Sequence, residues 1–130
     1  LYIIFDMVSR DKVAFVQSQS DVLLLALPKG NGNLCLPSKM VSYMLSGKAV
    51  LASVDEDSTT ARYISESKCG ISVQPDSMES FIEGFLHFSR IKKEEIDAIG
   101  RNSRSYSLAH LTREKNLKTV VDKIKAIIDK

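Results

Sequence analysis

Two short apolar runs in the first half of the chain constrain its fold more than any other feature. One is Val22–Leu27 and the other is Ala49–Val54, and neither shows a regular alternation of apolar and polar residues. Continuous apolar strands of this kind are typical of parallel sheets that are covered on both faces. Segments with helical patterns lie between and after the runs, so the sequence predicts βαβ units.

Strands and helices are expected to alternate along the whole chain. The sequence predicts strands over 1–5, 22–27, 49–54 and 70–73, and helices over 10–18, 37–46, 58–67, 76–90, 92–110 with a break near Gly100, and 113–129. The expected N-terminal caps are Ser9, Asp57 or Ser58, Asp76 in a capping box with Glu79, and Thr112. Because βαβ connections are right-handed, helices should cover both sheet faces. The predicted fold class is α/β, a Rossmann-like, doubly wound parallel sheet with C-terminal helices.

Several helices show an apolar side at helical spacing, which predicts a buried face. The expected core residues are Val13, Phe15 and Val16 in the first helix, Met40, Val41, Met44 and Leu45 in the second, and Phe81, Phe85 and Phe88 in the fourth. The last helix carries one apolar stripe of Leu117, Val120, Val121, Ile124 and Ile127 or Ile128.

Composition excludes several classes of protein. The 130 residues fit a single domain, 1–130, and the net charge of +2, with Lys and Arg scattered among acids, argues against a nucleic-acid partner. No apolar run reaches the roughly 18 residues of a membrane span. Two cysteines make neither a disulfide framework nor a four-ligand metal cluster. We expect a cytoplasmic protein, at most peripherally associated with the inner face of a membrane.

The segment 31–50 carries the strongest functional signal. A polar loop with Gly30 and Gly32 follows a predicted strand, and Pro37, Ser38 and Lys39 then open a helix. Free N–H groups and the positive end of the helix dipole make such a helix start a site for an anion. The loops at the carboxyl ends of the strands, 6–9, 28–36, 55–58 and 74–76, should form the binding edge of the sheet. The alternative is a solvated lysine on an ordinary helix.

Other polar residues give weaker evidence for a functional site. Asp55 and Asp57 resemble an Asp-x-Asp metal motif, with Thr59 and Thr60 on the same rim, but a solvated turn before a helix is the simpler interpretation. Cys35 lacks a nearby histidine, so a nucleophilic role is disfavoured, and His87 and His110 are expected to have no catalytic role. The chain has no Gly-x-Gly-x-x-Gly, P-loop or Gly-x-Ser-x-Gly motif. This argues against a dinucleotide oxidoreductase, an NTPase and an α/β hydrolase.

The order of these signals is similar to a known family. The segments that carry the likeness are Ser20–Leu25, Leu36–Lys39, Met44–Ala52, Gly70–Asp76 and Ile99–Tyr106. Together they resemble the C-terminal, donor-binding domain of retaining GT-B glycosyltransferases of the glycosyl transferases group 1 family. The branch with Pro-Ser-Lys at this position makes bacterial capsular, lipopolysaccharide and colanic-acid-type polysaccharides. The likeness runs from about residue 3 to residue 125.

The resemblance implies an enzyme that transfers a sugar, with retention, from a nucleotide diphosphate sugar to a glycan or lipid-linked acceptor. It implies no cofactor and no metal, because backbone N–H groups and Lys39 would stabilise the leaving diphosphate. The implied donor contacts are Gly32, Asn33, Leu34, Cys35, Leu36, Pro37, Ser38, Lys39 and Ser42, with Phe5, Asp6 and Met7 near the base. The catalytic residues remain unknown. Many relatives carry two glutamates separated by seven residues, where this chain has Leu34 and Ser42.

The resemblance also implies that the chain is a fragment. It begins on an apolar strand, and the upstream strands and the acceptor-binding N-terminal lobe of the family have no counterpart in its 130 residues. We therefore expect it to be inactive alone. Two alternatives stay open at this point. One is a GT-B-fold nucleotide-sugar epimerase, and the other is a non-catalytic α/β interaction module. A receiver domain is disfavoured because Asp55 has no matching Lys-Pro pair.

Overall fold

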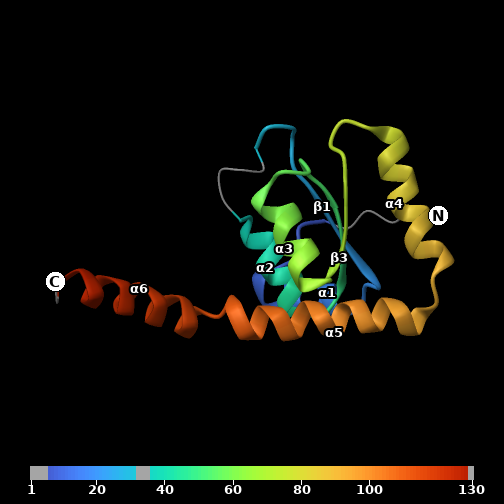
Figure 1. Cartoon of the computed structure of the whole chain (residues 1–130). Helices are drawn as coiled ribbons and strands as arrows, with labels where there is room; N and C mark the ends of the chain where they lie inside the picture. Colours follow the sequence, from blue (N-terminus) through green and yellow to red (C-terminus); the bar gives the residue numbers. More distant parts are fainter. Residues whose placement is uncertain (1–5, 32–35, 129–130) are drawn as a thin grey trace.

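The chain folds into three parallel strands with helices on both faces (Figure 1). It is described here from a computed structural model that covers residues 6–31 and 36–128. The strands β1 (Val22–Ala26), β2 (Ala49–Ser53) and β3 (Gly70–Val73) lie in sequence order, with β2 in the centre. The predicted α/β fold class is confirmed. The strand predicted at 1–5 lies outside the described residues.

The helices form a layer on each side of the sheet and a base below it. Their bounds are Arg10–Lys12 (the 3-10 turn η1), Val13–Ser18 (α1), Ser38–Leu45 (α2), Thr59–Ser67 (α3), Met78–Arg90 (α4), Lys93–His110 (α5) and Arg113–Ile128 (α6). The helices α2 and α3 pack on one face and α4 packs on the other. The long helix α5 runs across the amino ends of the strands, and α6 extends away from the body (Figure 1).

The core consists of two apolar layers separated by β2, all five residues of which are buried. On one face, Val50 and Ala52 pack with Met40 and Met44 of α2 and Ile64 of α3. On the other face, the core residues are Ala49, Leu51, Phe88 and Ile96. The prediction of a strand buried on both faces is therefore correct for β2.

The same prediction is wrong for one face of β1. Leu25 is buried against α2, but Leu24 on the opposite face keeps 41% of its surface exposed and Ala26 is exposed. The reason is the position of α4, whose Gly84 lies against Leu51 of β2 and Val73 of β3. Val22 at the start of β1 packs against the layer of Phe88 and Ile96, but no described helix covers Leu24 and Ala26 on that side.

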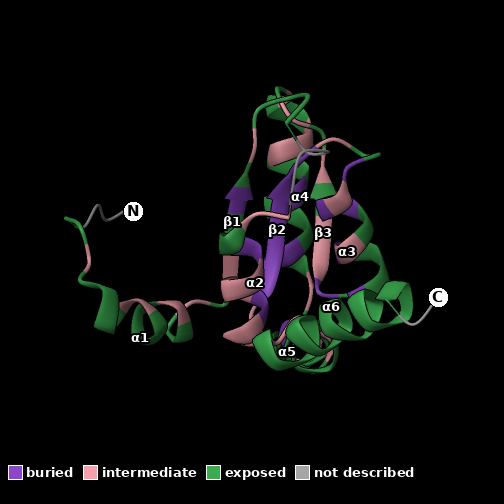
Figure 2. Ribbon diagram, turned by 90° about the vertical axis from the view of Figure 1, so that its left-hand side faces the viewer, coloured by how far each residue is buried: buried purple, intermediate pink, exposed green. Residues whose placement is uncertain are grey.

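The first helix also departs from expectation. Phe15 is 67% exposed and Val16 is 45% exposed, and Val13 is only half-buried, so the predicted apolar core face of this helix is wrong. Its N-terminal turn is a 3-10 helix, and the Ser9 side chain makes no cap hydrogen bond. Figure 2 shows α1 standing off to the side of the sheet, where a six-residue helix has little to pack against.

The other helix starts are decided by hydroxyl side chains. Ser58 accepts a hydrogen bond from the Ala61 amide and caps α3, as the sequence allowed. Ser77, not Asp76, caps α4, because Asp76 adopts a left-handed φ of 61° that a cap does not use. Thr112 accepts from the Lys115 amide and caps α6.

The later helices show three further differences. In α4 only Phe88 is buried, whereas Phe81 is half-buried and Phe85 is 52% exposed, so the predicted aromatic core is only partly correct. The predicted break near Gly100 is wrong, because α5 is continuous through it. The apolar stripe of α6 is present, but no residue of this helix is buried. Among the described helices, none combines the length and the apolar character needed to cross a membrane.

Candidate functional site

The carboxyl ends of the three strands meet at the edge opposite α5 (Figure 1). Here the loop after β1 is tied to the loop after β2, because a carboxylate oxygen of Asp55 accepts a hydrogen bond of 2.7 Å from the Gly30 amide. Gly30 has a φ of +83°, which a glycine adopts without strain. A hollow of about 190 Å³ lies beside this contact, lined by Lys29, Asp55, Glu56, Asp57, Gln74 and Pro75.

The Asp55–Asp57 turn has a structural explanation. Asp55 holds the neighbouring loop, and the buried Ser58 caps α3. Thr60 is fully buried, so it does not lie on the rim where the sequence placed it. Within residues 6–31 and 36–128, no three His, Cys, Asp or Glu side chains gather closely enough to hold a metal ion. The arrangement favours the interpretation as a turn.

The N-terminal end of α2 differs from that of its neighbours. Pro37 is its N-cap and supplies no side-chain hydrogen bond, and the first turn contains no acidic residue. Elsewhere, serine or threonine caps serve α3, α4 and α6, and acidic residues occupy the first turns of α4, α5 and α6. Among the described α-helices of eight or more residues, α2 alone lacks both devices. The partial positive charge at the N-terminal end of α2 is therefore not balanced by a side chain of the first turn.

A cavity of about 960 Å³ lies beside this helix start. Its lining residues are Met7, Val8, Val13, Val16, Gln17, Ser20, Leu23, Ser38, Lys39, Ser42 and Tyr43. The structure thus brings Met7 to the same cavity as Ser38, Lys39 and Ser42, although about 30 residues separate them in the chain. Large, mostly apolar cavities with a few convergent polar groups are typical of small-molecule sites.

The remaining predicted site residues divide into three groups. Phe5, Gly32, Asn33, Leu34 and Cys35 lie outside the described residues. Leu36 packs against the core and Pro37 is half-buried at the start of α2. Asp6 is exposed and does not line the cavity.

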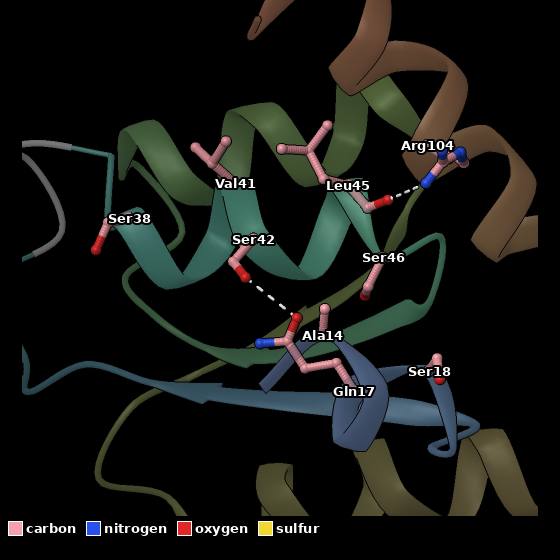
Figure 3. A pocket seen from close by; sticks show the side chains of 9 residues that line it. All are labelled: Ala14, Gln17, Ser18, Ser38, Val41, Ser42, Leu45, Ser46 and Arg104. Atoms are coloured by element: carbon pink, nitrogen blue, oxygen red, sulfur yellow. Dashed lines mark hydrogen bonds between the residues drawn. The ribbon is translucent and has the colours of Figure 1, made fainter. Parts of the chain in front are cut away.

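The hydroxyl of Ser42 is already engaged. It donates a hydrogen bond of 3.1 Å to the side-chain oxygen of Gln17 on α1 (Figure 3). A second cavity of about 570 Å³ also borders this bond and is lined by Ala14, Gln17, Ser18, Ser38, Val41, Ser42, Leu45, Ser46 and Arg104. Gln17 and Ser42 therefore contribute to the walls of both cavities.

Gln17 and Arg104 are the residues that the sequence reasoning missed. A signal for Gln17 exists, because a polar residue four positions after Val13 lies on the same helix side as an expected core residue. Arg104 belongs to the segment 99–106, and its guanidinium donates to the Leu45 carbonyl at the C-terminal end of α2 (Figure 3). A cation at this position satisfies a free carbonyl and complements the helix dipole.

The other reactive side chains lie away from the cavities. Cys69 is fully buried, and burial raises the pKa of its thiol, which the neighbouring Ser67 and Ser103 hydroxyls offset in part. His87 is exposed and packs edge-on to Phe88, and His110 packs on Tyr106.

Comparisons of the chain with protein-family models, curated proteins and solved structures found no match. What the site can bind follows from its own chemistry. One part of the larger cavity contains the positively charged N-terminal end of α2, which has no side-chain cap or acidic residue, and the ammonium group of Lys39. Both suit an anion. The Gln17–Ser42 pair offers neutral hydrogen-bonding groups, and apolar walls surround both parts.

Proposed function

We propose that this chain is the donor-binding part of a retaining glycosyltransferase of bacterial surface polysaccharide synthesis. The observation that carries the proposal is the start of α2, which has neither a side-chain cap nor an acidic first turn and presents Ser38 and Lys39 to a 960 Å³ cavity. The proposed ligand is a nucleotide diphosphate sugar. Its acceptor is a glycan or a lipid-linked glycan.

The physical basis is electrostatic. The first N–H groups of a helix lack a carbonyl acceptor one turn earlier, although in α2 the Met40 amide donates to the Pro37 carbonyl. The helix dipole adds partial positive charge at this end. Lys39 alone would be unfavourable at this end of a helix, and a bound diphosphate offsets that repulsion. When the bond from the sugar to the diphosphate breaks, negative charge grows on the leaving group. Donors fixed around that group stabilise the charge as it develops.

The test is a binding measurement on the 130-residue chain, because binding of the donor does not require the acceptor. Titration calorimetry with uridine and guanosine diphosphates and their sugar derivatives should detect one site. In Lys39→Ala, loss of a charged hydrogen bond of roughly 1.5–3 kcal/mol should weaken binding about tenfold to a hundredfold. Lys118→Ala on the exposed helix α6 is the matched control and should bind like the original chain.

Two outcomes contradict the proposal. One is equal affinity of the Lys39→Ala variant and the original chain. The other is no binding of any nucleoside diphosphate. A chelator added to the same titration tests the remaining metal interpretation of Asp55 and Asp57, and we expect binding to be unaffected by it.

A further inference from the structure

We infer that α6 binds an anionic lipid surface and lies along it with its apolar side toward the acyl chains. The helix spans Arg113–Ile128 and is the last element that the structure describes. None of its residues lines either of the two cavities beside α2, so the inference does not depend on the proposed function. If both hold, α6 keeps the nucleotide site near a lipid-linked acceptor.

The apolar side of α6 has no partner within the described residues. All 16 residues of the helix are exposed. In Figure 1, α6 extends beyond the end of α5 and away from the sheet. Single exposed apolar residues are ordinary, but a continuous apolar patch marks an interaction surface. Six aliphatic side chains, each between 45% and 74% exposed, form the patch: Leu117, Val120, Val121, Ile124, Ile127 and Ile128.

The arrangement of residues around the helix axis suits a lipid interface. At about 100° per residue, the six aliphatic side chains occupy an arc of about 120°. Lys125 borders this arc on one side and Lys123 on the other, each about 40° beyond the nearest aliphatic residue. Lysine stems at such borders lie along the apolar surface and place their ammonium groups among the lipid headgroups. The apolar arc and its basic borders therefore match the two layers of a lipid surface.

The charge of α6 favours an anionic surface. The helix carries five basic and two acidic side chains, a net charge of +3, whereas the other 114 residues carry 13 basic and 14 acidic ones. Among the described residues, no side chain of α6 takes part in an ion pair. Two copies of α6 packed on each other would bring the same positive charges together, which disfavours self-pairing. Anionic lipid headgroups attract these charges.

The first experiment measures cosedimentation of the 130-residue chain with lipid vesicles. One set of vesicles is phosphatidylcholine alone, and the other is equal parts of phosphatidylcholine and phosphatidylglycerol. Binding to the anionic vesicles should be at least about tenfold tighter and should weaken as salt is added, because salt screens the attraction. Equal binding to the two sets, or no binding to either, would overturn the inference.

Two matched substitutions test the apolar side of α6. Ile124→Asp places a negative charge in the middle of the apolar arc, and Thr119→Asp places the same charge on the polar side. Ile124→Asp should weaken binding to anionic vesicles more than about tenfold, and Thr119→Asp less than about threefold. Both variants should remain folded by circular dichroism, since both residues are exposed. Equal losses would show that the apolar side does not enter the lipid.

A pair of charge reversals tests the basic borders of the arc. Lys123→Glu/Lys125→Glu reverses the charge at both borders. Lys12→Glu/Arg90→Glu makes the same change in net charge at exposed residues outside α6 and is the control. The first double variant should weaken binding to anionic vesicles about a hundredfold and the control less than about threefold. Equal effects would assign binding to the overall charge of the chain and contradict a role for α6.

Fluorescence reports which side of α6 meets the lipid. The chain contains no tryptophan, so a single introduced tryptophan is an unambiguous probe. On anionic vesicles the emission of Ile124→Trp should shift to shorter wavelength, because the indole enters an apolar layer. Ala126→Trp, on the polar side, should show little shift. A shift in both variants or in neither would contradict the proposed orientation.

Two further results separate this inference from a protein partner and from the proposed function. If the chain binds no vesicles but forms dimers that Ile124→Asp disrupts, α6 pairs with a second copy and the inference is wrong. Nucleoside diphosphates are titrated separately, without vesicles. Failure of that titration with intact vesicle binding contradicts only the proposed function, and the reverse result contradicts only this inference.

Discussion

The backbones of Gly100 and Gly47 are in direct contact, so that a Cβ atom added to Gly100 would lie 2.2 Å from the Gly47 carbonyl oxygen. This contact fixes α5 against the turn that joins α2 to β2. One helical turn further along α5, Arg104 donates to the Leu45 carbonyl and secures the end of α2 from the same side. The placement of the candidate anion site at the other end of α2 therefore depends on α5.

Substitution of Gly100 should show how tight this contact is. In an ordinary helix, Gly→Ala stabilises by about 1 kcal/mol, but here Gly100→Ala should destabilise the protein by roughly 3 kcal/mol, because backbone must move. Gly84→Ala is the comparison, since its new Cβ would meet the end of the flexible Leu51 side chain at 2.6 Å. We expect it to cost about 1 kcal/mol. Urea unfolding measures both, and equal stability of Gly100→Ala and the original chain would refute the contact.

Substitutions of Met44 and Phe15 should differ in their effect on stability, although the sequence predicted both residues to lie in the core. Met44 is fully buried, and Met44→Ala should cost about 2–5 kcal/mol in the free energy of unfolding. Phe15 is 67% exposed, so Phe15→Ala should change that free energy by no more than about 0.5 kcal/mol. Thermal or urea unfolding of the two variants checks the difference. A large effect of Phe15→Ala would show that α1 packs more tightly than described here.

The hydrogen bond from the Gly30 amide to Asp55 should stabilise the folded chain, and a substitution that keeps an oxygen acceptor should retain most of that stability. Asp55→Ala removes the acceptor of the Gly30 amide and should cost about 1 kcal/mol. Asp55→Asn retains an oxygen acceptor and should recover most of this loss. Glu56→Ala, on the exposed neighbouring residue, is the control and should have almost no effect. Equal losses in the alanine and asparagine variants would assign the effect to charge rather than to the hydrogen bond.

Cys69 should make stability depend on pH in the alkaline range. Burial raises the pKa of its thiol in the folded protein above the ordinary value of 9.0. As the pH rises past that value, the unfolded chain ionises first, which favours unfolding. The contribution of Cys69 to the free energy of unfolding is therefore fully present below the pKa of the thiol in the unfolded chain. It is lost as the pH rises through the pKa of the thiol in the folded protein.

The measurement is urea unfolding of the original chain and of Cys69→Ala at several pH values from about 7 to 10.5. The stability advantage of the original chain should narrow above about pH 9. Other groups titrate in both proteins and cancel in the difference. A constant difference across the range would mean that the thiol is not shielded from solvent.

Local sequence patterns predicted one buried strand and several helix starts correctly. The run Ala49–Ser53 is apolar except for Ser53, which predicts a strand buried on both faces. The structure confirms this, because all five residues are buried. Ser58 and Thr112 were expected at helix starts, where their hydroxyls accept amide hydrogens. The start of α2 was predicted within one residue, because proline suits the first helical position, where no amide hydrogen is needed; in the structure Pro37 is the N-cap and the helix begins at Ser38.

The sequence by itself determined the alternation of elements, the parallel sheet and the location of Ser38 and Lys39 at a helix start. The alternation and the helix start depend on residues close in the chain, and the continuous apolar runs indicate a parallel sheet although its strands pair over 20 or more residues. Tertiary structure alone decided that Phe15, Leu24 and Phe85 stay exposed, because an apolar pattern does not reveal whether another element covers it. It also decided that Gln17 meets Ser42, 25 residues away. Only the position of α1 relative to α2 in the folded chain brings those two side chains within hydrogen-bonding distance.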